Sequence, residues 1–236
     1  MEISEIINDA IRYPINNVKA VVIYLILSVI LGAVLGGTVG TVFTSSVVNN
    51  VIAAFGLSII GIIITILLGF LINGYELDII RYGITKDSDA PEIDFVRQFL
   101  DGVKLFIVKI VYYLIPAIIG VILSFILQDW LSTIISLILF IIFALAEFMG
   151  ECRLAKHDDL STALSIGEAI ADISKVGFLK LVVVIVVVTI ISLVLSIICG
   201  ALIKWNPIVG GFVSGIFGVY CVFFTGRAAG LLYSEV

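Results

Sequence analysis

The stretch "LVVVIVVVTIISLVLSII", residues 181–198, decides the fold because its side chains are apolar on every face. A strand of a membrane β-barrel would alternate apolar and polar side chains over about 10 residues. An unbroken apolar run predicts instead a helix that crosses a lipid bilayer, for which about 20 residues are enough.

The rest of the chain has the same character. Of its 236 residues, 61% are hydrophobic and 13% are charged, and the mean hydropathy is +1.28. Stretches long enough to cross a membrane as helices lie at 20–43, 51–73, 110–127, 131–149, 178–203 and 208–225. The sequence therefore predicts an all-α integral membrane protein with six transmembrane helices.

The basic residues predict the orientation. Twelve of the 13 lysines and arginines fall on one side of the predicted spans, and only Lys204 falls on the other. Short loops that are rich in Lys and Arg stay in the cytoplasm. We expect a multi-pass protein of the cell membrane with both termini in the cytoplasm, and with Trp130 and Trp205 at the opposite interface.

Three charged segments with helical apolar spacing precede the odd-numbered spans. They occupy residues 2–19, 91–109 and 161–180 and align on Lys19, Lys109 and Lys180. Each even-numbered span ends in a glycine, at Gly74, Gly150 or Gly226. The pattern predicts one membrane domain, 1–236, of three parallel hairpin repeats (about 1–83, 84–160 and 161–236), each preceded by a cytoplasmic amphipathic helix. A pseudo-threefold bundle and a linear array of hairpins are both open.

Two of these segments carry signals for a helix start. Asp89 with Glu92, and Ser165 with Glu168, have the spacing of a capping box. In the middle segment an apolar stripe runs from Ile93 through Val96, Leu100 and Val103. We expect that stripe to lie on the membrane.

Small residues predict where spans pack. Gly32, Gly36 and Gly40 form a ridge on the first span, and Gly211 and Gly215 form another on the last. Such ridges allow helices to approach closely. Contacts within the chain are the favoured interpretation, and a seam between two copies is the alternative.

No catalytic, cofactor-binding or metal-binding residues are predicted. The chain has one histidine, His157, and its three cysteines lack CxxC spacing. Ser214 lacks the G-x-S-G of rhomboid-type proteases, because Phe212 stands at the first glycine position. We expect that the protein is not an enzyme.

Partners follow from composition in the same way. A net charge of −5 makes the chain a poor binder of nucleic acid. We expect membrane lipids as partners, with a homo-oligomer or another membrane protein as open alternatives.

Charged residues crowd the ends of two spans. Glu147 is the one candidate for an acid inside a span, and we expect it to sit at the interface and pair with Arg153 or Lys156. A candidate interaction surface is formed by residues at the ends of the second and fourth spans: Glu76, Asp78, Arg81, Arg153 and Lys156.

The region after the second span resembles a known family. Gly74, Tyr75, Arg81, Pro91, Asp101, Gly102, Lys104, Tyr113 and Pro116 occur in the order and spacing of a family of mainly archaeal polytopic membrane proteins known only as a domain of unknown function. The chain departs from that family at Ala90, where a bulky apolar residue is expected. The resemblance implies an archaeal cell membrane and about six spans, and it implies no activity.

Two functions remain open. The first is a non-enzymatic scaffold or accessory component with amphipathic helices at the membrane interface. The second is a permease or channel for an uncharged or lipid-like solute along the axis of the repeats. A cavity lined by polar groups from all three repeats would favour the second, and a centre packed with Gly and Leu would exclude it.

Overall fold

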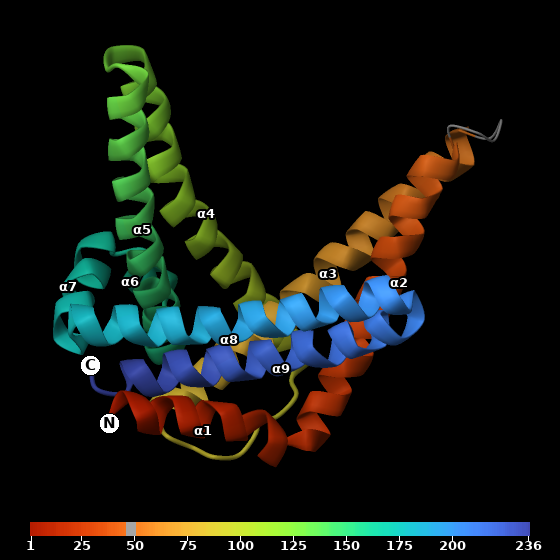
Figure 1. Cartoon of the computed structure of the whole chain (residues 1–236), viewed down its shortest axis with the longest axis horizontal. Coiled ribbons are helices and arrows are strands. Elements are labelled where there is room, and N and C mark those ends of the chain that lie inside the picture. The colour runs from red at the N-terminus through yellow and green to blue at the C-terminus, as the bar shows by residue number, and fades with distance from the viewer. Residues whose placement is uncertain (46–50) are drawn as a thin grey trace.

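Long helices account for most of the chain (Figure 1). The computed structural model describes residues 1–45 and 51–236, with side chains described at 1–32, 34, 59–206 and 209–236. The helices are α1 (Ile3–Asn16), α2 (Val18–Ser45), α3 (Val51–Ile84), α4 (Phe95–Ile126), α5 (Asp129–His157), α6 (Leu160–Ala163), α7 (Ile166–Val176), α8 (Phe178–Trp205) and α9 (Pro207–Tyr233).

The number of spans agrees with the sequence. Within the described residues, α3, α4, α5, α8 and α9 are each long and apolar enough to cross a membrane. Helices α1 and α2 meet at an angle of 75° and add a sixth span if the pair is counted as one. The prediction of an all-α, multi-pass membrane protein is confirmed; the structure has five candidate spans, or six if this bent pair is one span, where the sequence predicted six.

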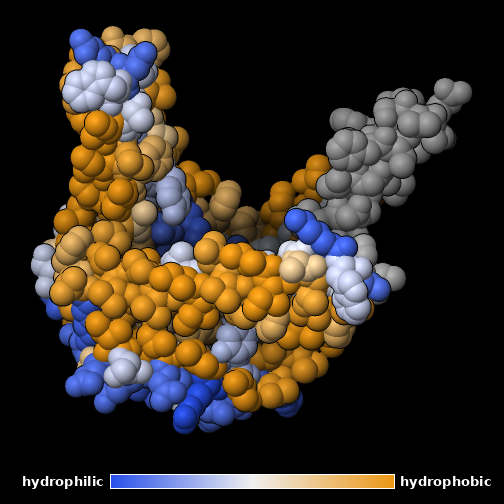
Figure 2. All heavy atoms as spheres, in the orientation of Figure 1, coloured by the Kyte–Doolittle hydropathy of each residue, from blue (hydrophilic) through white to orange (hydrophobic). Residues whose placement is uncertain are grey.

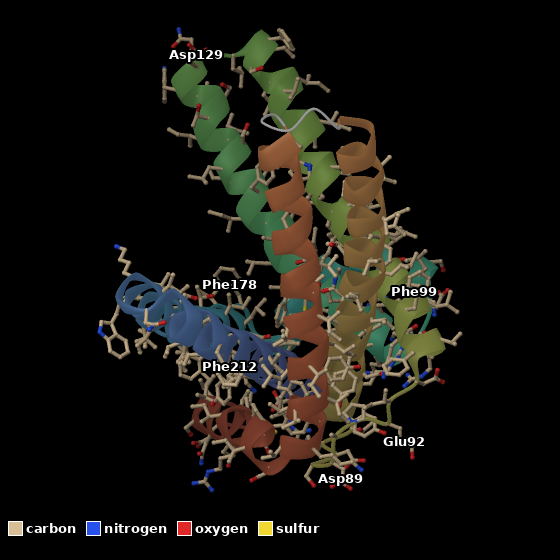
Figure 3. All side chains as sticks on the ribbon, turned by 90° about the vertical axis from the view of Figure 1, so that its right-hand side faces the viewer. Asp89, Glu92, Phe99, Asp129, Phe178 and Phe212 are labelled. Atoms are coloured by element: carbon tan, nitrogen blue, oxygen red, sulfur yellow. The ribbon has the colours of Figure 1, made fainter. Side chains whose placement is uncertain are left out.

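The long helices form three antiparallel hairpins, α2/α3, α4/α5 and α8/α9, which diverge from a common base. We call this end the base; it consists of α1, α6, α7, the segment 85–94 and the adjoining ends of the long helices. Both termini lie there (Figure 1). Seen from the side, α8/α9 points in a different direction from the two other hairpins (Figure 3).

The hairpins are apolar on the outside and little buried. Only 11% to 28% of the most apolar window of each span is buried inside the protein, and Leu137 and Ile197 are 60% and 63% exposed. Hydrophilic side chains gather at the base and at the tip of α4/α5 (Figure 2). This is the surface expected of helices that face lipid.

The predicted amphipathic segments take two forms. Helices α1 and α7 are separate elements, and each buries its apolar face against a long helix: Ile6 and Ala10 of α1 face α9, and Ala169 and Ile173 of α7 face α5. The middle segment is continuous with its span, because α4 runs without a break from Phe95 to Ile126.

The predicted start of that middle helix is wrong. Helix α4 begins after Asp94, whose Oδ1 accepts a hydrogen bond from the backbone N of Arg97 at 3.1 Å. Residues 89–94 are not helical, and Pro91 contributes to this because proline disfavours helix at the residue before it. The hydroxyl of Tyr13 also donates to the carbonyl of Asp89. The other predicted start is confirmed in position, since Ser165 is the N-cap of α7.

The first turns of α4 are polar on the inside and apolar on the outside. Gln98 and Asp101 are 0% and 2% exposed, whereas Val96 and Leu100, in the predicted stripe, are 73% and 54% exposed. Water-soluble helices have the opposite arrangement, so this part of α4 is suited to contact with lipid.

The predicted glycine ridges do not all pack within the chain. Among the residues whose side chains are described, a Cβ atom added at Gly32 or Gly211 would meet no atom within 4 Å, so contacts with that part of the chain are the wrong interpretation for these two. Gly215 lies against Leu25. Gly36 and Gly40 lie outside the residues whose side chains are described.

Candidate functional site

The closest approach between helices at the base is the crossing of α3 and α4. A Cβ on Gly74 would lie 1.7 Å from the carbonyl oxygen of Gln98, and a Cβ on Gly102 would lie 2.0 Å from that of Phe70. Only glycine fits at either position, because any side chain would overlap the backbone of the other helix. This crossing brings the charged residues of both helices together.

Two carboxylates are buried at the crossing. Asp78 on α3 and Asp101 on α4 are 1% and 2% exposed. Nη1 of Arg81 lies 2.7 Å from the first and 2.6 Å from the second. Arg97 also binds Asp78, at 2.6 Å, and Lys104 binds Asp101, at 3.2 Å. Buried carboxylates need such partners, because an unpaired charge away from water is costly.

The crossing is tied to the end of α5 through Asp158. This carboxylate accepts hydrogen bonds from Arg81 at 3.0 Å and from Lys104 at 2.8 Å. Burial alone would raise the pKa of Asp158, but the hydrogen bond from Lys104 and the charge of Arg81 outweigh it and hold the pKa below its ordinary value. Nε of Arg81 also donates to the carbonyl of Ala155.

A second arginine binds a buried carboxylate between α5 and α7. Arg153 lies 2.7 Å from Asp172, which is 0% exposed, and it also pairs with Glu168. The hydroxyl of Tyr233 donates to Asp172 at 2.6 Å. Burial works to raise the pKa of Asp172, but hydrogen bonds from Lys175, Tyr233 and Arg153 outweigh it, and the pKa lies below its usual value.

A third arginine joins α9 to α1. Nε of Arg227 lies 2.7 Å from Oδ1 of Asp9. Its guanidinium lies over the ring of Tyr13, 4.7 Å from the centroid, and donates to the carbonyls of Tyr82 and Asp87. Each of α3, α5 and α9 therefore carries, in its last two turns, an arginine that binds an aspartate on another helix of the base.

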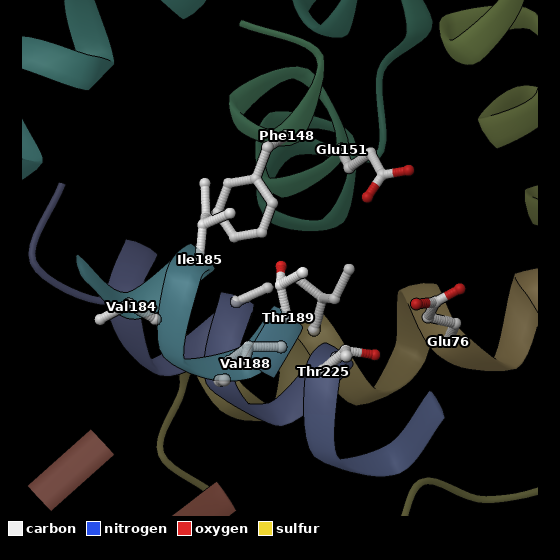
Figure 4. A pocket seen from close by; sticks show the side chains of 12 residues that line it. Glu76, Phe148, Glu151, Val184, Ile185, Val188, Thr189 and Thr225 are labelled. Carbon is white, nitrogen blue, oxygen red and sulfur yellow. The ribbon is translucent and has the colours of Figure 1, made fainter. Parts of the chain in front are cut away.

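A cavity lies next to the base where helices of all three hairpins meet. Its volume is about 310 Å³. Glu76 of α3 and Glu151 of α5 line one end, near Thr225 of α9 (Figure 4). Apolar residues of α5, α8 and α9 form most of the remaining wall: Phe148, Val184, Ile185, Val188, Gly226, Ala228 and Ala229.

Two more charged residues lie next to the glutamates at this end of the cavity without lining it. Lys109 of α4 lies 3.0 Å from Glu151. Glu147, one turn before Glu151, is 8% exposed, and its charged neighbours are Glu151, Lys109 and Glu76. The predicted pairing of Glu147 with Arg153 or Lys156 is wrong, because those two side chains face α7 and Tyr233 on another side of α5.

The five residues of the predicted interaction surface lie in different surroundings. Glu76 lines the cavity. Asp78 and Arg153 are buried in ion pairs, and Arg81 is largely covered. Lys156 is exposed, with its ammonium 5.7 Å from the ring centre of Tyr233. A role for these five residues in binding a partner stays a prediction.

The sequence matches a known protein family. The model of a family described as "Protein of unknown function (DUF4013)" matches residues 57–203, more than half of the chain. The chain belongs to the DUF4013 family. The resemblance seen in the sequence is thereby confirmed as a domain of unknown function, and archaeal origin stays a prediction. No curated protein and no solved structure matches this DUF4013 protein.

Most of the residues that carried the resemblance meet at the α3–α4 crossing. Gly74 and Gly102 make the close contact, and Arg81, Asp101 and Lys104 form the ion pairs above it. Within the DUF4013 sequence these residues therefore share one local role, which is to fix how the first two hairpins join.

Sequence reasoning missed Lys109 and Glu151 as partners, and it missed that Asp101, Asp172 and Asp9 bind the three arginines from other helices. One signal was available. Asp101 with Lys104, and Asp172 with Lys175, share an acid-x-x-lysine spacing in the two segments that align on Lys109 and Lys180. No local pattern indicates the cavity, because its lining comes from four helices.

Proposed function

We propose that this DUF4013 protein is a non-enzymatic scaffold or accessory component of the cell membrane, with both termini in the cytoplasm, whose hairpins engage membrane lipids. The single observation that carries the proposal is the exposure of the hairpins. Apolar side chains such as Leu137 and Ile197 are left more than half exposed by the described part of the chain. Lipid tails are the surroundings that such surfaces fit.

The base supports the proposed orientation. Arg81, Arg153 and Arg227 lie there together with both termini, whereas Trp130 and Trp205 lie at the far ends of their hairpins. This distribution is what the excess of Lys and Arg on cytoplasmic loops would produce.

The three arginine–aspartate pairs support three repeats arranged in a ring. Arg81 binds Asp101 on the helix that follows α3, and Arg153 binds Asp172 on the helix that follows the α5–α6 turn. Arg227 binds Asp9 on α1, at the other end of the chain. A linear array would leave the last arginine without an equivalent partner, so the pairs favour a closed arrangement.

Photo-crosslinking in membranes tests the proposal. A diazirine amino acid placed at Leu137 or at Ile197 should crosslink mainly to lipid, and the same amino acid at Leu105, which is 1% exposed, should react within the chain. Crosslinks between position 137 and α8 of the same molecule would mean that the hairpins close on each other, and the proposal would be lost. Crosslinks between differently tagged copies would mean that a second copy of the chain, and not lipid, covers the apolar surface of the hairpins.

A second function, a permease for a lipid-like solute, is favoured by the cavity, whose polar residues come from all three hairpins. Scrambling of a fluorescent phospholipid between the leaflets of proteoliposomes is the appropriate measurement. A rate above that of empty liposomes, reduced by filling the cavity with Val188→Trp, is expected. A rate equal to that of empty liposomes would exclude this function for phospholipids.

A further inference from the structure

The cavity at the meeting point of the hairpins has the form of a small-molecule site. Its volume, about 310 Å³, is near the lower end of the range for ligand pockets. Its wall is mostly apolar, and its few polar groups gather at the end that holds Glu76 and Glu151 (Figure 4). Above the base, Figure 2 shows a hollow between the hairpins with hydrophilic atoms at its floor.

The charges at the polar end do not balance. Three carboxyl groups, those of Glu76, Glu147 and Glu151, have one ammonium group, that of Lys109, among their charged neighbours. Glu147 also forms a hydrogen bond with Glu151, which takes up one proton, and Glu76 forms one with Thr225. With that proton counted, two negative charges still face one positive charge. Thr225 can offer only a hydroxyl. The surplus of carboxyl groups lies on helices that cross the membrane, where neither water nor salt screens charge well. A surplus in such a place requires protons or a bound cation.

The buried charges at the base show how this chain satisfies carboxylates that have no ligand. Asp78, Asp101 and Asp172 each have at least two basic side chains within 4 Å. Glu151 has one such partner within the described residues, and Glu76 has no basic partner at that distance there. The cavity end is therefore the place where a cation from outside the chain would complete the set.

We propose that the cavity binds an amphiphile with a protonated amine as its head. The ammonium lies between the carboxylates of Glu76 and Glu151, and the apolar tail lies along Val184, Val188 and Phe148. An anionic amphiphile is repelled by the same carboxylates, and a neutral one gains only the apolar contact. The site is independent of the scaffold and transport functions considered above, since it requires binding alone.

Three hexyl compounds with different heads provide the test. Binding of hexylamine, hexanol and hexanoate to the protein in nanodiscs is measured by calorimetry, with empty nanodiscs as the reference. We expect hexylamine to bind at least tenfold more tightly than hexanol and hexanoate not to bind. Equal affinity for the three compounds, or no saturable binding of hexylamine between pH 6 and pH 9, would overturn the proposal, and the second result would mean that protons alone satisfy the carboxyl groups.

Variants separate the cavity from the surface. Glu76→Gln leaves the Lys109–Glu151 ion pair in place and should reduce the preference for the amine at least fivefold. Glu92→Gln, a matched change at an exposed residue of the segment 85–94, should leave it unchanged. Val188→Trp should weaken hexylamine and hexanol together. Retention of the full amine preference in Glu76→Gln would place the amine elsewhere and refute the proposed site.

Discussion

The guanidinium of Arg227 is almost fully buried and lies 2.7 Å from the carboxylate of Asp9, 218 residues earlier in the chain. The two residues join the last long helix to the first helix. Asp9 is 41% exposed, whereas Arg227 is 2% exposed, so the arginine depends on the aspartate more than the reverse.

Removal of Asp9 should therefore leave a buried cation without its counter-charge. We expect Asp9→Ala to reduce the free energy of unfolding by about 2 kcal/mol, because Arg227 loses its charged partner but keeps its hydrogen bonds to the carbonyls of Tyr82 and Asp87. Asn8→Ala, an exposed neighbour on α1, should change it by less than about 0.5 kcal/mol. Denaturation in mild detergent measures both, and equal effects of the two changes would contradict a buried ion pair.

The α3–α4 crossing should not tolerate a methyl group. In Gly102→Ala the new Cβ would lie 2.0 Å from the carbonyl oxygen of Phe70, so the helices must separate. We expect a loss of about 3 kcal/mol or more, or failure to fold. The matched control is Gly69→Ala on α3. A Cβ added there would have no atom of another described helix within 4 Å, and alanine has the higher helix propensity. A similar melting temperature for the two variants would show that the crossing is not tight.

Stability should fall in acid because of Asp172 and Asp158. Both carboxylates have a pKa below the ordinary value in the folded protein. Their contribution to stability is therefore fully present above the unfolded-state pKa of about 4, and it is lost as the pH falls through the folded-state pKa. Unfolding measured from pH 7 to pH 3 should show this loss.

Asp172→Asn provides the control for that measurement. This variant should lose about 2 kcal/mol at pH 7, where the native carboxylate is ionised, and much less at pH 3. Because the variant lacks one titrating group, its stability should depend less steeply on pH. A slope equal to that of the native chain would mean that Asp172 does not contribute to the acid transition.

The outer face of α4 offers a test of position in the membrane. Val96 is 73% exposed and Lys86 is also exposed, so cysteines at both sites are accessible in the protein alone. If the start of α4 contacts lipid, a membrane-impermeant maleimide should label Val96→Cys at least tenfold more slowly than Lys86→Cys. Equal labelling rates in membranes would place the first turns of α4 in water. In denaturant, the labelling rates of Val96→Cys and Lys86→Cys should be equal.

The helices could be predicted from the sequence, but the contacts between them could not, for a physical reason. An apolar run such as 181–198 excludes water whatever surrounds it, so helix and membrane follow from local sequence. The partners of Arg153 and Arg227 depend on how distant helices pack, and no local pattern contains that information. Glu147 illustrates the same limit: its basic neighbour, Lys109, comes from α4, and the nearby basic residues in sequence face elsewhere.

The prediction of where α4 begins was wrong for a different reason. Asp89 and Glu92 have the spacing of a capping box, but Pro91 between them and the hydrogen bond from Tyr13 disfavour helix in this segment. Asp94 then caps the helix. Pro91, which the sequence contains, and the contact with Tyr13, which no sequence pattern shows, together outweighed the capping-box spacing.

The packing of α1 on α9 has a consequence for synthesis. The ribosome makes α1 before α9, so the face that holds Ile6 and Ala10 lacks the helix that covers most of it until α9 has also been made. Helix α1 therefore lacks its contact with α9 while α2 to α8 are inserted into the membrane. A chain that stalls before residue 207 would carry an uncovered amphipathic helix at its start, which a chaperone or protease of the quality-control system could recognise.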